Sequence, residues 1–404
     1  MKITQEFIKK IPKTDLHLHL DGSMRLSTLI ELAHENDIPL PGNTEKELKK
    51  KVFKDKYNDL GEYLQGFSYT GAVLQNESSL ERVSYELGVD NIEEGVRYIE
   101  VRFAPQLHQH KHLGIANVLK AVNRGLERAK NEFNLSPAVQ SGQDVPFAYG
   151  MIVCAMRMFD YGYSEYFDSL LDVHKYSERK WIFSIASQEL VKASVETRDR
   201  FKLPIVGFDL AGQEKGYPAV DHKQAYSLAH KSFLKKTVHA GEAFGPESIF
   251  QAITELNADR IGHGVHLFNS NMIYASEIED KEAYVENLAQ YIGDRRITLE
   301  VCLTSNMQTI PDFKELKDHS FGKMREAGLS VTFCTDNRLV SSTTVTDEIL
   351  KAVETFDISV KELKNLIAYG FKRSFFPGTY LEKRNYVRQV LDAYEATEKL
   401  FKQK

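Results

Sequence analysis

The chain has 404 residues, of which 42% are hydrophobic and 27% are charged, as in an ordinary folded protein. Its net charge of −5 argues against a protein that binds nucleic acid through a basic surface. No stretch approaches the roughly 18 apolar residues of a membrane span, and the N-terminal residues lack the apolar core of a secretory signal, so we expect a cytoplasmic protein with neither nucleic acid nor a membrane as partner.

Eight short apolar or β-branched runs that end in polar residues alternate with longer amphipathic stretches. The runs begin at Thr14, Tyr98, Phe147, Ile205, Lys235, Arg260, Ile297 and Leu329. Residues 246–259 give the clearest helical pattern, because Pro246 suits the first turn and apolar residues then recur at helical spacing. The three cysteines, Cys154, Cys302 and Cys334, lie within the strand-like runs, which indicates reduced thiols.

The alternation of strands and helices predicts an α/β protein with a parallel sheet. Eight strands are the number that closes a (β/α)8 TIM-type barrel. The alternative, an open doubly wound sheet, usually carries a glycine-rich phosphate turn after its first strand, and that turn is missing here. We therefore predict one barrel domain over residues 1–404.

Two regions exceed the needs of the barrel itself. Residues 21–96 contain several helical patterns, more than one crossover helix requires. Helices inserted after the first strand would lie over the carboxyl-end mouth of the barrel, so we interpret 21–96 as a lid. Residues 345–404 are expected to form additional C-terminal helices.

Polar residues at the ends of separate strands point to one shared site. His17 and His19 lie two apart on the first strand, so their imidazoles share a face and can chelate a divalent ion. Later strands end in His239, His263 and Asp336. Groups at strand ends of a barrel meet at its mouth, where catalytic residues are typically found.

This set favours a mononuclear metal site with one position left for water. The candidate ligands are His17, His19, His239 and Asp336. A bound metal brings the pKa of water towards roughly 7, and Glu242 is then free to act as a proton donor. His263 could either orient or deprotonate the water. A binuclear site would need a bridging ligand, for which Asp209 is the one candidate at the third or fourth strand.

Seven segments in order carry a resemblance to a known family. They are TDLHLHLDGS, YIEVRFAP, GFDLAGQE, TVHAGE, RIGHGVHL, EVCLTSN and CTDN. With them the chain resembles the adenosine deaminase family of metal-dependent barrel hydrolases over essentially its whole length. The zinc motif of cytidine-type deaminases is absent.

The resemblance implies an enzyme that converts adenosine to inosine and ammonia with one zinc ion per chain. It assigns zinc binding to the four candidate ligands, Asp336 being catalytic as well. Glu242 would protonate the purine N1, and His263 would hold the attacking water. Because Glu242 must then carry a proton, its burial is expected to raise its pKa.

The resemblance also implies substrate contacts. Asp21 would bind the ribose 5′-hydroxyl and repel a phosphate, and Gly212 would donate its N–H to the purine N3. Both residues also fit ordinary turns. Leu64 and Phe67 would cover the purine, together with Leu60 and Tyr63. Their helical spacing fits a core-facing helix equally well.

One departure from the family pattern concerns the eighth strand. The family commonly has Asp-Asp-Pro where this chain has Asp336-Asn337-Arg338. Asn337 carries an amide donor at any pH, so contact with the purine N7 could persist. The change leaves the exact purine substrate open. For Arg338 we expect a surface role rather than a catalytic one.

Other functions remain open from the sequence. Adenine or a modified adenosine could be the substrate, or the chain could be a non-catalytic relative that binds a ligand. An amide or phosphoester hydrolase on the same barrel would carry two metals. His108, His110 and His112 are expected to lie in a solvated loop rather than to form a second metal site. The sequence does not indicate an oligomeric state.

Overall fold

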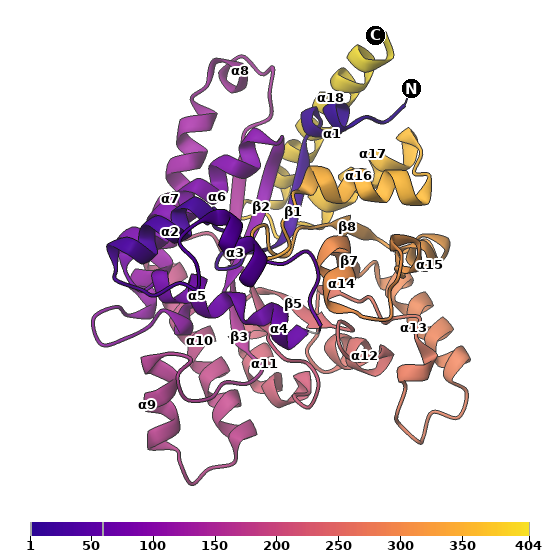
Figure 1. The fold of residues 1–404 in the computed structure, drawn as a ribbon. Helices are drawn as coiled ribbons and strands as arrows, with labels where there is room; N and C mark the ends of the chain where they lie inside the picture. Colours follow the sequence, from indigo (N-terminus) through magenta and orange to yellow (C-terminus); the bar gives the residue numbers. More distant parts are fainter. Residues whose placement is uncertain (1, 59, 404) are drawn as a thin grey trace.

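The computed structural model describes residues 2–58 and 60–403, apart from the side chain of Leu60 (Figure 1). It confirms all eight predicted strands. These are β1 (Lys13–His19), β2 (Val96–Phe103), β3 (Ala148–Met156), β4 (Ile205–Ala211), β5 (Lys235–Ala240), β6 (Arg260–His263), β7 (Thr298–Val301) and β8 (Val331–Phe333). The apolar run from Ile297 is strand only at its start, because its final residues begin helix α14 (Leu303–Thr309).

The strands form one parallel sheet in the order β1 to β8, so every neighbour in the sheet is a neighbour in the chain. Beyond the end of β8, the backbone of Asp336 returns to β1. Its N–H donates to the carbonyl of His17 at 2.8 Å, and its carbonyl accepts from the N–H of His19 at 2.8 Å. These two hydrogen bonds close the sheet, which confirms the (β/α)8 barrel.

Helices surround the barrel between successive strands (Figure 1). They are α7 (Ile115–Asn134), α8 (Pro137–Gln140), α9 (Glu165–Val173), α10 (Arg179–Phe201), α11 (Lys223–Lys231), α12 (Pro246–Thr254), α13 (Lys281–Arg295), α14 and α15 (Phe321–Glu326), with short 3₁₀ turns at η1 (Pro105–Leu107), η2 (Ala219–His222), η3 (Ser270–Met272) and η4 (Leu316–Asp318). Helix α12 begins at Pro246, as predicted, and ends five residues before the predicted end.

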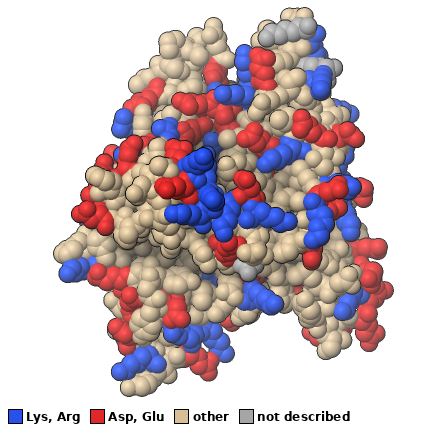
Figure 2. All heavy atoms as spheres, in the orientation of Figure 1, with Lys and Arg blue, Asp and Glu red and all other residues tan. Residues whose placement is uncertain are grey.

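Five helices lie between β1 and β2. They are α2 (Leu26–Glu35), α3 (Glu45–Lys51), α4 (Leu60–Leu64), α5 (Gly66–Val73) and α6 (Glu77–Glu93). Helix α3 starts with a capping box between Thr44 and Glu47 and ends in exposed lysines, which suit the negative end of the helix dipole. Figure 2 shows these basic side chains on the surface over α3, beside acidic ones.

The C-terminal helices are α16 (Val345–Phe356), α17 (Val360–Arg373) and α18 (Tyr380–Gln403). Helix α1 (Gln5–Lys10) packs against α18, where the ring of Phe7 lies 5.9 Å from that of Tyr394 and 5.3 Å from that of Phe401. The first and the last helix therefore lie side by side (Figure 1). Among the described residues no helix is both long and apolar enough to span a bilayer.

Candidate active site

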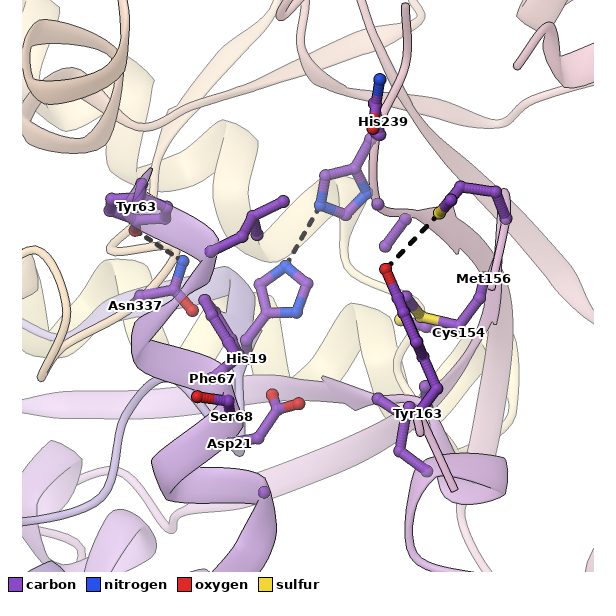
Figure 3. Close-up of a pocket in the computed structure, with 18 of the residues that line it drawn as sticks. His19, Asp21, Tyr63, Phe67, Ser68, Cys154, Met156, Tyr163, His239 and Asn337 are labelled. Atoms are coloured by element: carbon purple, nitrogen blue, oxygen red, sulfur yellow. Dashed lines mark hydrogen bonds between the residues drawn. The ribbon is translucent and has the colours of Figure 1, made fainter. Parts of the chain in front are cut away.

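A cavity of about 650 Å³ lies at the carboxyl ends of the strands (Figure 3). Strand ends supply one side of its lining, including His19, His239 and Asp336. Helices α4 and α5 supply the other side, including Leu64 and Phe67. Because barrel enzymes build their active sites at this end, the cavity is the candidate active site.

The four predicted metal ligands come together, and His19, His239 and Asp336 line the cavity while His17 is buried beside them. Strand β1 carries His17 and His19, β5 carries His239, and Asp336 follows β8. One ligand atom from each lies within 4.8 Å of those of the other three. The Nε2 atoms of His19 and His239 face each other at 3.1 Å (Figure 3). Asp336 Oδ1 lies 3.4 Å from Nε2 of both His17 and His19.

The cluster fits a divalent cation better than a hydrogen-bonded core. Nε2 of His17 is buried, and apart from the long contact with Asp336 it has no hydrogen-bond partner among the described residues, a state that costs free energy unless a ligand compensates it. Burial lowers the pKa of His19, which favours the neutral imidazole that a metal requires. Three imidazole nitrogens and a carboxylate oxygen are a donor set that suits zinc.

Two buried carboxylates hold the histidines in this orientation. Glu300 Oε2 accepts from Nδ1 of His17 at 2.8 Å, and Asp209 lies 3.1 Å from Nδ1 of His239. Each contact directs the opposite ring nitrogen towards the cluster, as around metal-binding histidines generally. Arg102 bridges the two acids, because its guanidinium lies 2.9 Å from Asp209 and 2.8 Å from Glu300. Although burial alone would raise it, Arg102 keeps the pKa of Glu300 well below its usual range.

Asp209 is thus engaged by Arg102 and His239 and is outside the group of four ligand atoms. We did not predict Glu300 from the sequence. Its signal is a single acid in the middle of an apolar strand, a position where a carboxylate must be paired.

Glu242 and His263 lie beside the metal ligands. Burial, reinforced by the charge of Asp336, raises the pKa of Glu242 to about 8. Its Oε1 lies 3.7 Å from Nε2 of His263. His263 and Asp336 both have left-handed backbones, with φ of 63° and 61°. Such strain in non-glycine residues is concentrated at functional sites, where it turns a side chain sharply at the end of a strand.

The loop that carries Glu242 is held by Glu214, which we also did not predict. One oxygen of Glu214 accepts from the backbone N–H of Gly241 at 2.9 Å. The other accepts from the N–H groups of Glu242, Ala243 and Phe244 at 3.1, 2.7 and 3.0 Å. The carboxylate therefore sets the path of the chain at the catalytic position. Its only signal in the sequence is an acid shortly after β4.

The comparisons with known proteins agree with this geometry. A family model described as adenosine deaminase matches residues 12–393, nearly the whole chain. The chain belongs to the adenosine deaminase family.

Members of this family from distant organisms resemble the chain along its length. An adenosine deaminase from Vibrio atlanticus is 32% identical over 365 residues, which are 90% of this chain and 94% of that protein. A probable adenosine deaminase from Dictyostelium discoideum is 34% identical over 375 residues. The match covers 93% of this chain but only 42% of the Dictyostelium protein.

Solved structures share the family fold. An adenine deaminase from Arthrobacter aurescens aligns with a TM-score of 0.70 and 23% identity over 95% of this chain and 98% of that one. The N6-methyl-AMP deaminase of Arabidopsis thaliana gives 0.72 and 23%, over 96% and 98%. An amidohydrolase with bound zinc from Burkholderia ambifaria gives 0.75 and 17%, over 100% and 97%. At these identities the likeness establishes the fold.

Asn337, the residue that departs from the family pattern, contacts helix α4. Nδ2 of Asn337 donates to the hydroxyl of Tyr63 on α4 at 2.7 Å (Figure 3). Oδ1 is buried against Gly22, where a Cβ atom would lie 1.8 Å from it. Only glycine fits at position 22, and the Asn337 side chain links the segment after β8 to helix α4.

The other predicted substrate contacts also line the cavity. Asp21 is buried, and burial raises its pKa to about 6. Gly212 has a φ of 97°, which glycine adopts readily. Tyr63 is not simply part of an apolar stripe, because its hydroxyl also lies 2.7 Å from Oγ of Ser341. The side chain of Leu60 lies outside the described residues.

One sequence-based expectation is wrong, and another is wrong in part. Arg338 is not a surface residue: its guanidinium pairs with Glu94, and its side chain is only 12% exposed. Where the family commonly has proline, this chain has a salt bridge that joins the segment after β8 to Glu94, the residue that caps the end of helix α6. His108, which directly follows η1, is fully buried beside Phe103 rather than solvated, whereas His112 is exposed. Within the described chain the three loop histidines do not gather into a metal-binding group.

Proposed function

We propose that this chain is a zinc-dependent deaminase that hydrolyses adenosine to inosine and ammonia. The observation that carries the proposal is the meeting, in one cavity, of a three-histidine, one-aspartate cluster with a buried Glu242 whose pKa is raised to about 8. Hydrolysis at C6 of a purine needs an activated water and an acid at the adjacent ring nitrogen. The metal cluster can activate the water, and Glu242 beside it can act as the acid.

One zinc ion per chain would be held by His17, His19, His239 and Asp336. When bound, it would lower the pKa of a water molecule towards neutrality and so supply a nucleophile at physiological pH. Glu300 and Asp209 keep two of these imidazoles in the correct tautomer through their Nδ1 atoms.

The remaining groups bind the purine and move protons. Glu242 gives its proton to N1 while water adds to C6 and loses a proton to solvent, and His263 hydrogen-bonds the oxygen that adds. The proton of the new C6 hydroxyl then passes to the amino nitrogen as the C6–N bond breaks, so ammonia leaves and a C6 carbonyl remains. Glu242 regains its proton from solvent. Gly212 donates its N–H to N3, and Leu64 and Phe67 cover the purine face.

A nucleoside fits this cavity better than a nucleotide. Of the described residues that line it, none is Lys or Arg, while Asp21 lies buried in its wall. A 5′-phosphate would therefore meet a carboxylate and no compensating cation. The Arabidopsis neighbour is named for a nucleotide substrate, and the lining of the present cavity argues against that substrate class for this chain.

We propose further that residues 1–404 act as one domain, in which the helices within 21–96 form the lid. The lid supplies Leu64, Phe67 and Tyr63 to the cavity. Binding of a purine would bury these apolar groups and exclude water from the reaction.

The test is a screen of purified, zinc-loaded protein against adenosine, adenine, N6-methyladenosine and AMP, following the loss of adenine-type absorbance. We expect kcat/KM for adenosine to exceed that for adenine and AMP by at least 100-fold. A preference for adenine or the N6-methyl compound would move the assignment to that substrate on the same site. Turnover of AMP at a similar rate would contradict the role of Asp21.

Glu242→Gln is the matched inactive control. It preserves size but carries no transferable proton, so we expect kcat to fall by about 1000-fold, within the range of general acid catalysis. Zinc content, measured by mass spectrometry, is expected to stay at one per chain. Absence of turnover by the wild-type protein on every compound, with zinc bound, would indicate a non-catalytic relative.

A further inference from the structure

A chain of buried hydrogen bonds runs away from the active site behind His263. Nδ1 of His263 lies 3.1 Å from Nδ2 of Asn306 on α14. Oδ1 of Asn306 lies 3.1 Å from Nε2 of His319. Nδ1 of His319 accepts from the backbone N–H of Phe321 at 3.0 Å. All three side chains are buried, and none of the functions proposed above uses Asn306 or His319.

The donor and the acceptor of each hydrogen bond in this series follow from the last bond, between the backbone of Phe321 and His319. A backbone N–H can only donate, so Nδ1 of His319 is an acceptor and its Nε2 carries the hydrogen. Burial lowers the pKa of His319 to about 3, so the ring is neutral. Nε2–H then requires an acceptor, which places the amide oxygen of Asn306 towards His319 and its NH₂ group towards His263.

The same reasoning determines which ring nitrogen of His263 carries the hydrogen. Because Asn306 donates to Nδ1 of His263, that nitrogen carries a lone pair, and the hydrogen of the neutral ring is on Nε2. Nε2 of His263 is buried, has no hydrogen-bond partner and belongs to a residue that lines the cavity. It therefore offers the cavity a fixed N–H donor and has no lone pair with which to accept a proton from water.

We propose that Asn306 and His319 are positioning residues that set the tautomer of His263. This inference rests on the proposed deaminase function and decides between two roles for His263. The ring acts as a hydrogen-bond donor to the oxygen that adds to C6, and it does not act as the base. The backbone of the segment 319–321, on the far side of α14, thereby controls the chemistry of a group in the cavity.

The first test is spectroscopic and does not depend on activity. Zinc-loaded protein labelled with ¹⁵N-histidine is compared with His263→Gln to assign the two ring nitrogens of His263. We expect Nε2 to be protonated and Nδ1 to be unprotonated. In Asn306→Asp the carboxylate can only accept from Nδ1, so we expect that nitrogen to gain a hydrogen. A protonated Nδ1 in the wild type, or an unchanged spectrum in Asn306→Asp, would overturn the proposal.

The second test separates positioning from general damage. Asn306→Leu has a similar size but cannot donate, so we expect kcat on adenosine to fall at least 10-fold with KM changed less than 2-fold. Thr309→Val, on the same helix, removes a buried hydroxyl that bonds only to the carbonyl of Ser305 and is expected to keep wild-type kcat. An equal loss in both variants, or none in either, would contradict the proposal.

His319 offers a conservative rescue. The amide nitrogen of Gln can replace Nε2 as donor to Asn306, whereas Leu cannot. We expect His319→Gln to keep the wild-type tautomer of His263 and His319→Leu to lose it. If the tautomers behave as expected but no purine is deaminated, the hydrogen-bond chain stands and the proposed function fails. If adenosine is deaminated but His263 has the opposite tautomer, the proposed function stands and the inference about the hydrogen-bond chain fails.

Discussion

At the scale of single residues, two neighbouring glutamates have different tasks. Glu214 is a pure acceptor whose oxygens are occupied by the backbone of residues 241–244. Glu242 is buried without such donors, so its pKa is raised to about 8, and the charge of Glu214 contributes to the rise. The first carboxylate therefore shapes the loop and also helps to keep a proton on the second.

This arrangement predicts a pH effect of Glu214→Gln. Glu242 is active as an acid while protonated, so kcat/KM is expected to fall as pH rises through its pKa, which a bound zinc ion would lower from about 8. Removing the charge of Glu214 lowers that pKa further. The alkaline limb of the pH profile should move to lower pH, and kcat should drop about 10-fold because the loop loses acceptors.

Glu247→Gln is the control for this experiment. Glu247 also accepts backbone hydrogen bonds, from Tyr274 at 2.8 Å and Ala275 at 3.0 Å, but it does not line the cavity. We expect an unchanged pH profile for this variant. If the alkaline limb of the kcat/KM profile of Glu214→Gln coincides with that of the wild type, or moves to higher pH, Glu214 does not raise the pKa of Glu242 through its charge.

At the scale of elements, the sequence predicts strands better than it predicts the contacts of the lid. The eight apolar runs locate β1 to β8, because burial on both faces demands apolar residues throughout a parallel strand. The same pattern overruns the end of β7, since the first turn of α14 is equally buried. Helix α4 shows a second limit of prediction from sequence. The helical spacing of its apolar residues indicates a buried face, but it does not reveal that the hydroxyl of Tyr63 binds Asn337.

Tyr63→Phe tests whether this contact stabilises the lid over the substrate. The variant leaves the amide of Asn337 and the hydroxyl of Ser341 without their partner, at a cost of about 1–3 kcal/mol. If the bonds form in the closed lid, KM for adenosine should rise about 10-fold, which corresponds to ~1.4 kcal/mol, with a smaller change in kcat.

Tyr69→Phe on α5 is the matched control, because Tyr69 does not line the cavity, and the KM of this variant should equal that of the wild type. Hydrogen–deuterium exchange of α4 would report the lid directly. Faster exchange in Tyr63→Phe alone is the expected result. Equal KM values in the two variants would remove Tyr63 from the closing mechanism.

At the scale of the whole molecule, the barrel brings together residues that are far apart in the chain. The strand ends were predictable because polar residues stand out at the end of an apolar run, and they located His17, His19, His239 and Asp336. Glu300, Glu214 and Asn306 were not predictable, since each is defined by a partner dozens to hundreds of residues away. Their contacts exist only after the strands have paired, and the contact of Glu300 with His17 also requires the barrel to close.

The metal site should therefore contribute to the stability of the closed barrel. Its four ligands join β1 and β5 to the residue that follows β8, so an ion bound there links three parts of the chain that separate on unfolding. Zinc that binds only the folded state stabilises it by about 4 kcal/mol at 1,000 times its Kd.

We expect chelation to lower the Tm by several degrees and one equivalent of zinc per chain to restore it. In His17→Gln, which lacks one ligand, the Tm should respond much less to added zinc. Restoration that requires two equivalents would favour a binuclear hydrolase, and a Tm insensitive to zinc in the wild type would show that these residues do not bind it.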